Sequence, residues 1–181
     1  MKGVVFVELL SMAEQAVGED AVDKVVSGCP LKSRGAYTSV GSYDSGELNT
    51  LVSGLSNATG HSVDALQRQF GHWMLRRFTE TYARFFDAKP DAFSMLESID
   101  NEVHVEVRKL YSDAELPRFE TQRLDDRTMR LVYTSPRRLI AFCHGLIEAT
   151  FNYYGETAEI EAVDKSTDIT GIVEFTIRKT T

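Results

Sequence analysis

Two hydroxyl groups and one guanidinium stand at alternate positions of one short segment, Tyr133-x-Ser135-x-Arg137. The side chains of a β-strand repeat on one face every second residue, so these three point to the same side if the extended conformation persists through Pro136. An arginine can bind a carboxylate through two parallel hydrogen bonds, and hydroxyls can fill the remaining lone pairs. The segment therefore predicts a site for a pair of carboxylates. The alternative is a polar strand end that leads into a helix.

His104 is the histidine whose neighbours favour a role in ligand binding. It lies between Val103 and Val105 and close to Val107, so a helix places it at the margin of an apolar stripe. The valines also alternate, which leaves a strand open as an alternative. A neutral imidazole that faces an apolar cavity suits a single axial haem ligand, whereas the ordinary alternative is a hydrogen-bonded core histidine. We expect plain surface or core roles for His61, His72 and His144.

The overall composition limits the partners of these groups. The chain has 181 residues, 43% of them hydrophobic and 26% charged, with a formal net charge of −7. This length predicts one domain, built as two packed lobes, that needs no disulfide or structural metal to fold. An acidic surface repels polyphosphate, and the sequence has no basic stripe, so we expect no binding of nucleic acid.

The cysteines and the apolar runs indicate a cellular location. Cys29 and Cys143 fit no zinc-ligand spacing and no disulfide framework, so we expect reduced thiols. Glu8 interrupts the first apolar run too early for a signal peptide. The sequence lacks the roughly 18 consecutive apolar residues of a membrane span. We therefore expect a soluble, cytoplasmic protein, and we expect it to be a monomer.

Helical spacing of apolar residues dominates the chain as far as about Leu110. It predicts helices around 22–26, around 48–55 with an end at Gly60, from Ser62 to just before Pro90, and from about Asp91 to Leu110. Gly71 is a point at which the third of these can divide, because a glycine inside a helix costs about 1 kcal/mol relative to alanine. His104 belongs to the last helix.

Strand spacing begins after Pro117. Residues 118–125 and 128–135 predict two strands joined at Asp125-Asp126, and strands near 157–163 and 171–178 flank a polar turn at 164–170. Between the two pairs we expect a helix from about Pro136 to Tyr154. The fold class is therefore α+β. A helical N-terminal lobe of about residues 1–65 packs on a lobe of about residues 66–181, which contains a small antiparallel sheet and an inserted helix.

The spacing of the motifs is similar to that of a known family. His104 stands 29 residues before Tyr133, and the segment 109–117, which ends at Pro117, lies between them. Together with the opening Met1-Lys2-Gly3 and the run 145–148, these motifs resemble the haem nitric oxide/oxygen-binding (H-NOX) family of stand-alone bacterial proteins, which is related to the haem domain of soluble guanylate cyclase. The resemblance covers the whole chain, including the order of helices and strands.

The resemblance implies the site residues of a haem protein. His104 would be the proximal ligand of the iron of haem b (iron protoporphyrin IX). Tyr133, Ser135 and Arg137 would hold the two propionates, and Pro117 would press on the porphyrin and distort it from planarity. The remaining contacts with haem that the resemblance implies come from five apolar side chains: Val5, Leu9, Met74, Phe142 and Leu146.

The resemblance also implies a preference among gases. Members of the family that hold O₂ have a tyrosine five positions after the motif arginine, and here that position is Phe142. Leu9 and Met74 at the other distal positions are apolar too. Bound O₂ carries partial negative charge and needs a hydrogen bond in a dry pocket, whereas bound NO does not. We therefore expect a ferrous, five-coordinate haem that binds NO and CO and excludes O₂.

The implied output is a change in a second protein. NO would weaken or break the bond between iron and His104, and the two lobes would shift. Because the chain ends at Thr181 directly after the last strand, we expect the signal to pass to a separate signalling protein, a histidine kinase or, alternatively, a cyclic-di-GMP enzyme. A haem-free ligand-binding or scaffolding module of the same fold is a further alternative. We do not expect an enzyme, because the distal positions are apolar and the sequence lacks GxSxG and HExxH.

Overall fold

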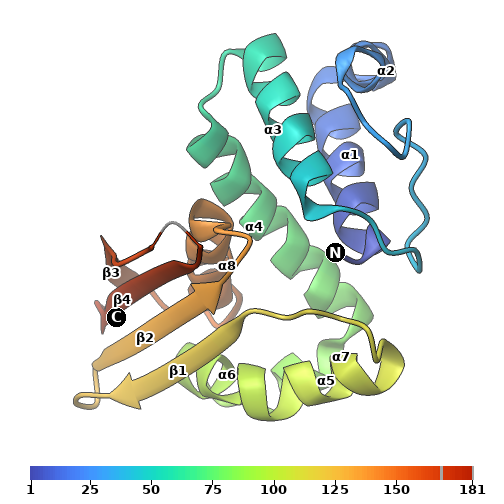
Figure 1. Ribbon diagram of the computed structural model, residues 1–181. Helices are drawn as coiled ribbons and strands as arrows, with labels where there is room; N and C mark the ends of the chain where they lie inside the picture. Colours follow the sequence, from blue (N-terminus) through green and yellow to red (C-terminus); the bar gives the residue numbers. More distant parts are fainter. Residues whose placement is uncertain (168, 181) are drawn as a thin grey trace.

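The computed structural model describes residues 1–167 and 169–180. Residues 3–81 form the helices α1 (Gly3–Val17), α2 (Glu19–Gly28), α3 (Ser45–Thr59) and α4 (Val63–Thr81), of which α1 to α3 lie together at one end of the molecule (Figure 1). Local signals set the helix ends. Asp44 accepts the N–H of Gly46 at the start of α3, and Gly60, at a left-handed φ of 76°, ends it. Ser62 caps α4, as the sequence predicts.

One face of each of α1, α3 and α4 builds the core of this helical end. The side chains that it buries almost completely are large and apolar: Phe6, Leu9, Leu51, Phe70 and Met74. Phe6 also stacks on Tyr37, with 4.5 Å between the ring centroids. Burying a side chain of this size contributes roughly 1.5–3 kcal/mol to folding. The cluster therefore fixes α1 against α4 and sets the positions of Leu9 and Met74.

The helical path continues through α5 (Ala83–Asp87), α6 (Ala92–Ser98), a π-helical turn η1 (Ile99–Val103) and α7 (His104–Leu110). The helix predicted from Asp91 to Leu110 is thus helical throughout but contains a π turn, and the strand alternative around His104 is wrong. Asp91 starts α6 by accepting the N–H of Ser94 at 2.7 Å. Gly71 does not divide the preceding helix. The break falls at Tyr82, where the backbone leaves helical geometry.

Four antiparallel strands form the sheet, which contains β1 (Arg118–Arg123), β2 (Thr128–Ser135), β3 (Ala158–Asp164) and β4 (Gly171–Lys179) in the order β1-β2-β4-β3. The predicted β1–β2 hairpin is confirmed. Alternate residues of β2 are buried, and this buried face carries Met129, Leu131, Tyr133 and Ser135. Apolar residues of α6 and of α8 (Ile140–Tyr153) cover the same face of the sheet. Asp168, in the predicted polar turn, lies outside the described residues.

Helix α8 starts later than the sequence predicts. Residues 136 and 137 form a turn after β2, and Arg138 has a φ of 53°, so the helix begins at Ile140 rather than near Pro136. Once formed, α8 packs closely on α4 through two glycines. A Cβ on Gly145 would lie 2.1 Å from the carbonyl oxygen of Arg68, and one on Gly71 would lie 2.5 Å from that of Phe142. Only glycine permits this approach of the two backbones.

The segment 111–117 connects α7 to β1 and is tied to the N-terminus. Lys2 Nζ donates to Asp113 Oδ2 at 2.9 Å, and the Ser42 hydroxyl donates to the same oxygen at 2.9 Å. The Lys2 ammonium also lies 5.1 Å from the centroid of the Tyr111 ring. These contacts join the helical end of the molecule to the segment that follows His104. Within the described ranges, no helix has both the length and the apolar character needed to cross a membrane.

Candidate functional site

His104 is buried, with 8% of its surface exposed, and is the first residue of α7. Its Nδ1 lies 2.8 Å from Asp100 Oδ1. Because a carboxylate only accepts hydrogen bonds, this contact places the proton on Nδ1 and leaves the lone pair on Nε2. Burial lowers the pKa of His104, and the hydrogen bond that its Nδ1–H donates to Asp100 opposes this shift. In the described part of the chain, Nε2 makes no hydrogen bond. The neutral imidazole therefore has a lone pair on Nε2 that could bind a metal.

Asp100 is a residue of this site that the sequence reasoning missed. Its second oxygen, Oδ2, accepts the backbone N–H of Phe119 at 3.1 Å, so the carboxylate joins η1 to β1. The signal for it was the i, i+4 spacing between an acid and a histidine in a predicted helix, since such side chains are neighbours on the helix surface. An acid in a helix is usually solvated, so this spacing alone does not distinguish Asp100 from a surface residue.

Tyr133 and Ser135 lie on the buried face of β2, which is the placement that strand alternation predicts. Ser135 is 2% exposed and Tyr133 is 4% exposed. Burial raises the pKa of Tyr133 to about 12, so the phenol keeps its proton at neutral pH. Two neutral hydroxyl groups thus stand at the end of the strand, in surroundings with little water. Such groups can donate hydrogen bonds to an anion.

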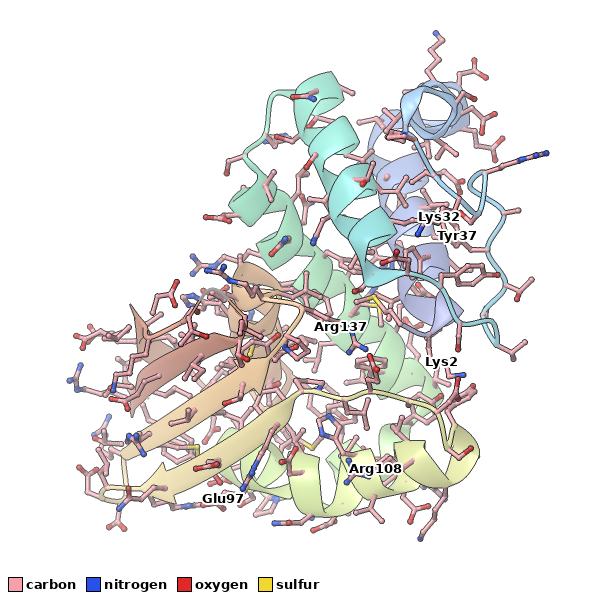
Figure 2. The ribbon with its side chains drawn as sticks, in the orientation of Figure 1. Lys2, Lys32, Tyr37, Glu97, Arg108 and Arg137 are labelled. Carbon is pink, nitrogen blue, oxygen red and sulfur yellow. The ribbon has the colours of Figure 1, made fainter. Side chains whose placement is uncertain are left out.

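Arg137 reaches the same region by a turn and not by extension of the strand. The extended conformation ends at Ser135, whose hydroxyl accepts the backbone N–H of Arg137 at 3.2 Å. The guanidinium contacts Glu115: Nη2 lies 2.7 Å from Oε2, and Nη1 donates to the carbonyl oxygen. Figure 2 shows Arg137 beside the segment between α7 and β1, in agreement with these contacts. A mostly buried cation therefore follows the two hydroxyl groups in the turn after β2.

The five apolar positions lie in one cluster. Leu9 on α1 and Met74 on α4 are fully buried, and the other three, Val5, Phe142 and Leu146, are partly buried against the same cluster. The ring of Phe142 lies 5.1 Å from that of Phe70, centroid to centroid. Pro117 is half-buried directly before β1 and two residues after Glu115. The chain thus forms an apolar wall from α1, α4 and α8.

The donor set fits a flat apolar group that carries a metal and an acidic edge. The imidazole offers Nε2 to a metal, the apolar wall suits a porphyrin, and the hydroxyls and the guanidinium suit carboxylates. Apart from the imidazole, the polar donors of this set lie at the end of β2 and in the turn after it: Tyr133, Ser135 and Arg137. The residues present therefore match haem.

Comparison with known proteins decides the family. The model of the haem-NO-binding family matches residues 2–162. The structure of an Fe(II) unliganded H-NOX protein from K. algicida is 35% identical and superposes with a TM-score of 0.93, covering 100% of this chain and 97% of that one. The chain belongs to the H-NOX family. The α+β fold inferred from the sequence, with its inserted helix, is confirmed.

More distant H-NOX structures share the fold. A protein from S. oneidensis in the Fe(II)NO ligation state is 24% identical with a TM-score of 0.90, and each chain covers 100% of the other. An oxygen-binding H-NOX domain related to soluble guanylate cyclases, solved as the oxygen complex, is 22% identical with a TM-score of 0.84; it covers 100% of this chain and 96% of that one. No curated protein matches the chain. H-NOX proteins bind haem, and this domain is a non-enzymatic gas sensor of that family.

Proposed function

We propose that this H-NOX domain holds haem through His104 and senses NO while excluding O₂. The observation that carries the proposal is the state of His104, whose Nδ1 is fixed by Asp100 and whose Nε2 makes no hydrogen bond within the described chain. A single neutral imidazole is the ligand of a five-coordinate ferrous haem. When bound, haem would supply an iron that can take NO, and His104 would be its protein ligand.

The acidic edge of haem is proposed to lie at the end of β2. Tyr133 and Ser135 donate hydroxyl hydrogen bonds to the propionates, and Arg137 supplies the positive charge. Hydrogen bonds to charged groups contribute roughly 1.5–3 kcal/mol each, which orients the ligand while the apolar wall provides most of the affinity. Pro117 is proposed to press on the porphyrin from the segment 111–117, which Arg137 holds through Glu115.

Exclusion of O₂ is supported by the apolar wall. Leu9, Met74 and Phe142 carry no hydrogen-bond donor in their side chains. Bound O₂ needs such a donor to stabilise its partial negative charge, whereas NO and CO bind without one. We therefore propose that NO and CO are the ligands of this domain.

The response is proposed to begin when His104 is released. His104 starts α7, and the segment after α7 contacts both the N-terminus, through Lys2 and Asp113, and Arg137, through Glu115. A shift of α7 therefore changes contacts with both proposed lobes, about residues 1–65 and about residues 66–181. Such a local trigger that acts on a two-state contact is a common signalling device.

The recipient of the signal is proposed to be a separate signalling protein, a histidine kinase in the first place and a cyclic-di-GMP enzyme as the second candidate. The support is the similarity to stand-alone bacterial H-NOX proteins. Cys29 and Cys143 are free thiols in the structure, which agrees with a reducing compartment such as the cytoplasm.

Absorbance spectra of the purified protein with haem test the proposal. We expect a ferrous Soret band that shifts with NO and with CO and is unchanged in air. A stable oxygen complex would contradict the exclusion of O₂, failure to bind haem would favour the haem-free module, and peroxide turnover would favour an enzyme. His104→Gly with added imidazole tests the trigger. Without imidazole, this variant should affect kinase autophosphorylation as NO does, and imidazole should reverse the effect.

A further inference from the structure

The carboxylate of Asp100 has both oxygens engaged by different elements of the fold. Oδ1 lies 2.8 Å from Nδ1 of His104, one helical turn further along the chain. Oδ2 accepts the backbone N–H of Phe119 at 3.1 Å, near the start of β1. About a quarter of the Asp100 side chain is exposed, whereas that of His104 is 11% exposed. One carboxylate thus connects the candidate iron ligand to the sheet.

The backbone around Asp100 is widened at this point. Residues Ile99–Val103 form the π turn η1, and the backbone N–H of His104 bonds to the carbonyl of Ile99, five residues earlier. Single π turns inside α-helical segments are rare and occur often at functional sites. Here the turn lies directly before the histidine and contains its partner.

The connection continues from β1 into β2. The Phe119 ring lies 5.7 Å from the His104 imidazole and 5.6 Å from the Tyr133 ring, between centroids. Phe119 is also the direct partner of Tyr133 in the antiparallel ladder. The residue whose N–H Asp100 holds is therefore packed between the imidazole and one of the proposed propionate ligands.

We propose that Asp100 is a positioning residue for the iron ligand. Its carboxylate keeps the proton on Nδ1 of His104, aims Nε2 at the metal and anchors η1 to β1. A carboxylate that accepts from the second nitrogen of a ligating histidine fixes its orientation and makes it a stronger donor. The inference deepens the proposed function and rests on it, because it requires that His104 bind the iron.

Asn at this position separates the two contacts of the carboxylate. The two N–H groups contact different oxygens of the carboxylate, and an amide has only one oxygen, so Asp100→Asn keeps the contact with Phe119 or the contact with His104 and loses the other. If the oxygen stays with Phe119, the amide NH₂ faces Nδ1–H, and two donors oppose each other. Glu102 offers a matched control. It lies in the same π turn, but its carboxylate is 53% exposed and pairs with Lys89 at 2.7 Å.

The first measurement is the iron–histidine stretching frequency of the ferrous, unliganded haem protein by resonance Raman spectroscopy. We expect a lower frequency in Asp100→Asn and the wild-type frequency in Glu102→Gln. We also expect the six-coordinate NO complex of Asp100→Asn to lose its histidine bond faster. A wild-type frequency in Asp100→Asn would overturn the inference. Absence of an iron–histidine band from the wild-type protein would instead overturn the proposed function.

A second measurement keeps Asp100 intact and so does not depend on how Asp100→Asn folds. In His104→Gly, free imidazole can bind iron and donate its second N–H to Asp100, whereas 1-methylimidazole has no N–H to donate. We expect imidazole to bind about tenfold more tightly than 1-methylimidazole, from the strength of a hydrogen bond to a charged group. The preference should disappear in His104→Gly with Asp100→Ala. Equal affinities in His104→Gly, or a preference that survives Asp100→Ala, would overturn the inference.

Discussion

Arg137 is held in place by an acid on a neighbouring segment. Its side chain is 11% exposed, and its guanidinium pairs with Glu115, which is 80% exposed. Replacement by alanine removes the positive charge from the proposed propionate site but leaves Glu115 in contact with water. We therefore expect Arg137→Ala to weaken haem binding roughly 10- to 100-fold, with little change in the urea unfolding of the haem-free protein. The rate of haem transfer to an excess of an acceptor protein measures the change.

Arg138 provides the control for this prediction. It is the adjacent cation, is exposed, and already has a φ of 53°, so Arg138→Ala changes the net charge equally without adding backbone strain. We expect its haem transfer rate to match that of the wild type. Equal transfer rates in the two variants would show that the charge at Arg137 has no special role.

Phe142 is the side chain proposed to set the gas preference in the same local way. It is half-buried on α8 and packs on Phe70, inside the apolar cluster that contains Leu9 and Met74. Phe142→Tyr adds one hydroxyl donor to surroundings with little water, so we expect a measurable oxygen complex in air. Phe142→Leu adds no donor and should give none. An absorption spectrum of the ferrous protein in air distinguishes them, and O₂ binding by both variants or by neither would contradict the role of a donor.

The position of a side chain could be predicted from the sequence where a local pattern, such as strand alternation, determines it. It could not be predicted where contacts with distant parts of the chain determine it. Alternation in a strand placed Tyr133 and Ser135 on one buried face. Arg137 arrives through a turn in which Ser135 accepts its N–H, so the alternation rule gave the wrong reason for its position. The i, i+4 spacing hints at the contact of Asp100 with His104, but its contact with the backbone N–H of Phe119, nineteen residues later, could not be predicted.

At the scale of elements, the spacing of apolar residues predicted which segments are helices and which are strands. It did not predict where α8 begins or that α4 continues through Gly71. Pro136 is compatible with a first helical turn, yet the hydrogen bond between Ser135 and Arg137 and the left-handed Arg138 hold a turn there. From the sequence alone, Gly71 is a position at which the helix can divide. In the structure it permits close contact with α8, and the packing of that helix supports a continuous α4.

The crossing of α4 and α8 gives a prediction at this scale. An alanine at Gly145 would place its Cβ 2.1 Å from the backbone oxygen of Arg68, and no rotamer can relieve a clash with backbone. We expect Gly145→Ala to lower the free energy of unfolding by about 1–3 kcal/mol, in the range of overpacked cores. Gly28→Ala is the control, since nothing lies within 4 Å of its added Cβ. Urea unfolding should show a lower midpoint for Gly145→Ala alone; equal midpoints would mean that the helices separate at little cost.

At the scale of the whole molecule, α8 belongs to two cores at once. Cys143, Ile147 and Phe151 pack against the sheet, whereas Phe142 and Leu146 pack against the helical end. A helix that is apolar on more than one side indicates burial, but its partners depend on the packing of the other elements. The division of the molecule around α8 could not be predicted for that reason.

Charged side chains of α4 and α8 form a cluster where these two helices meet. Arg68 donates hydrogen bonds to the carboxylate of Glu148, and Nε2 of His72 lies 3.0 Å from the same carboxylate. These contacts, of which the hydrogen bond from Arg68 has the largest effect, lower the pKa of Glu148 to about 2. His144 lies one turn earlier on α8, with its ring edge-on to Phe175. Burial, followed by the charge of Arg68, lowers the pKa of His144, although Glu148 acts in the opposite direction. The two groups should therefore respond to acid in separate ranges.

Stability should fall with acid in two steps. His144 takes up its proton more readily in the unfolded chain, so its contribution is complete above its ordinary pKa of 6.5 and declines as the pH falls through that value. The contribution of Glu148 is complete above its ordinary pKa of 4.5 and is lost as the pH falls from there towards 2. In urea unfolding of the haem-free protein, His144→Gln should weaken the pH dependence between 7 and 5. His61→Gln, which changes an exposed histidine, should leave it unchanged. If His144→Gln has the same pH dependence as the wild type, burial of this imidazole is not what makes the fold sensitive to mild acid.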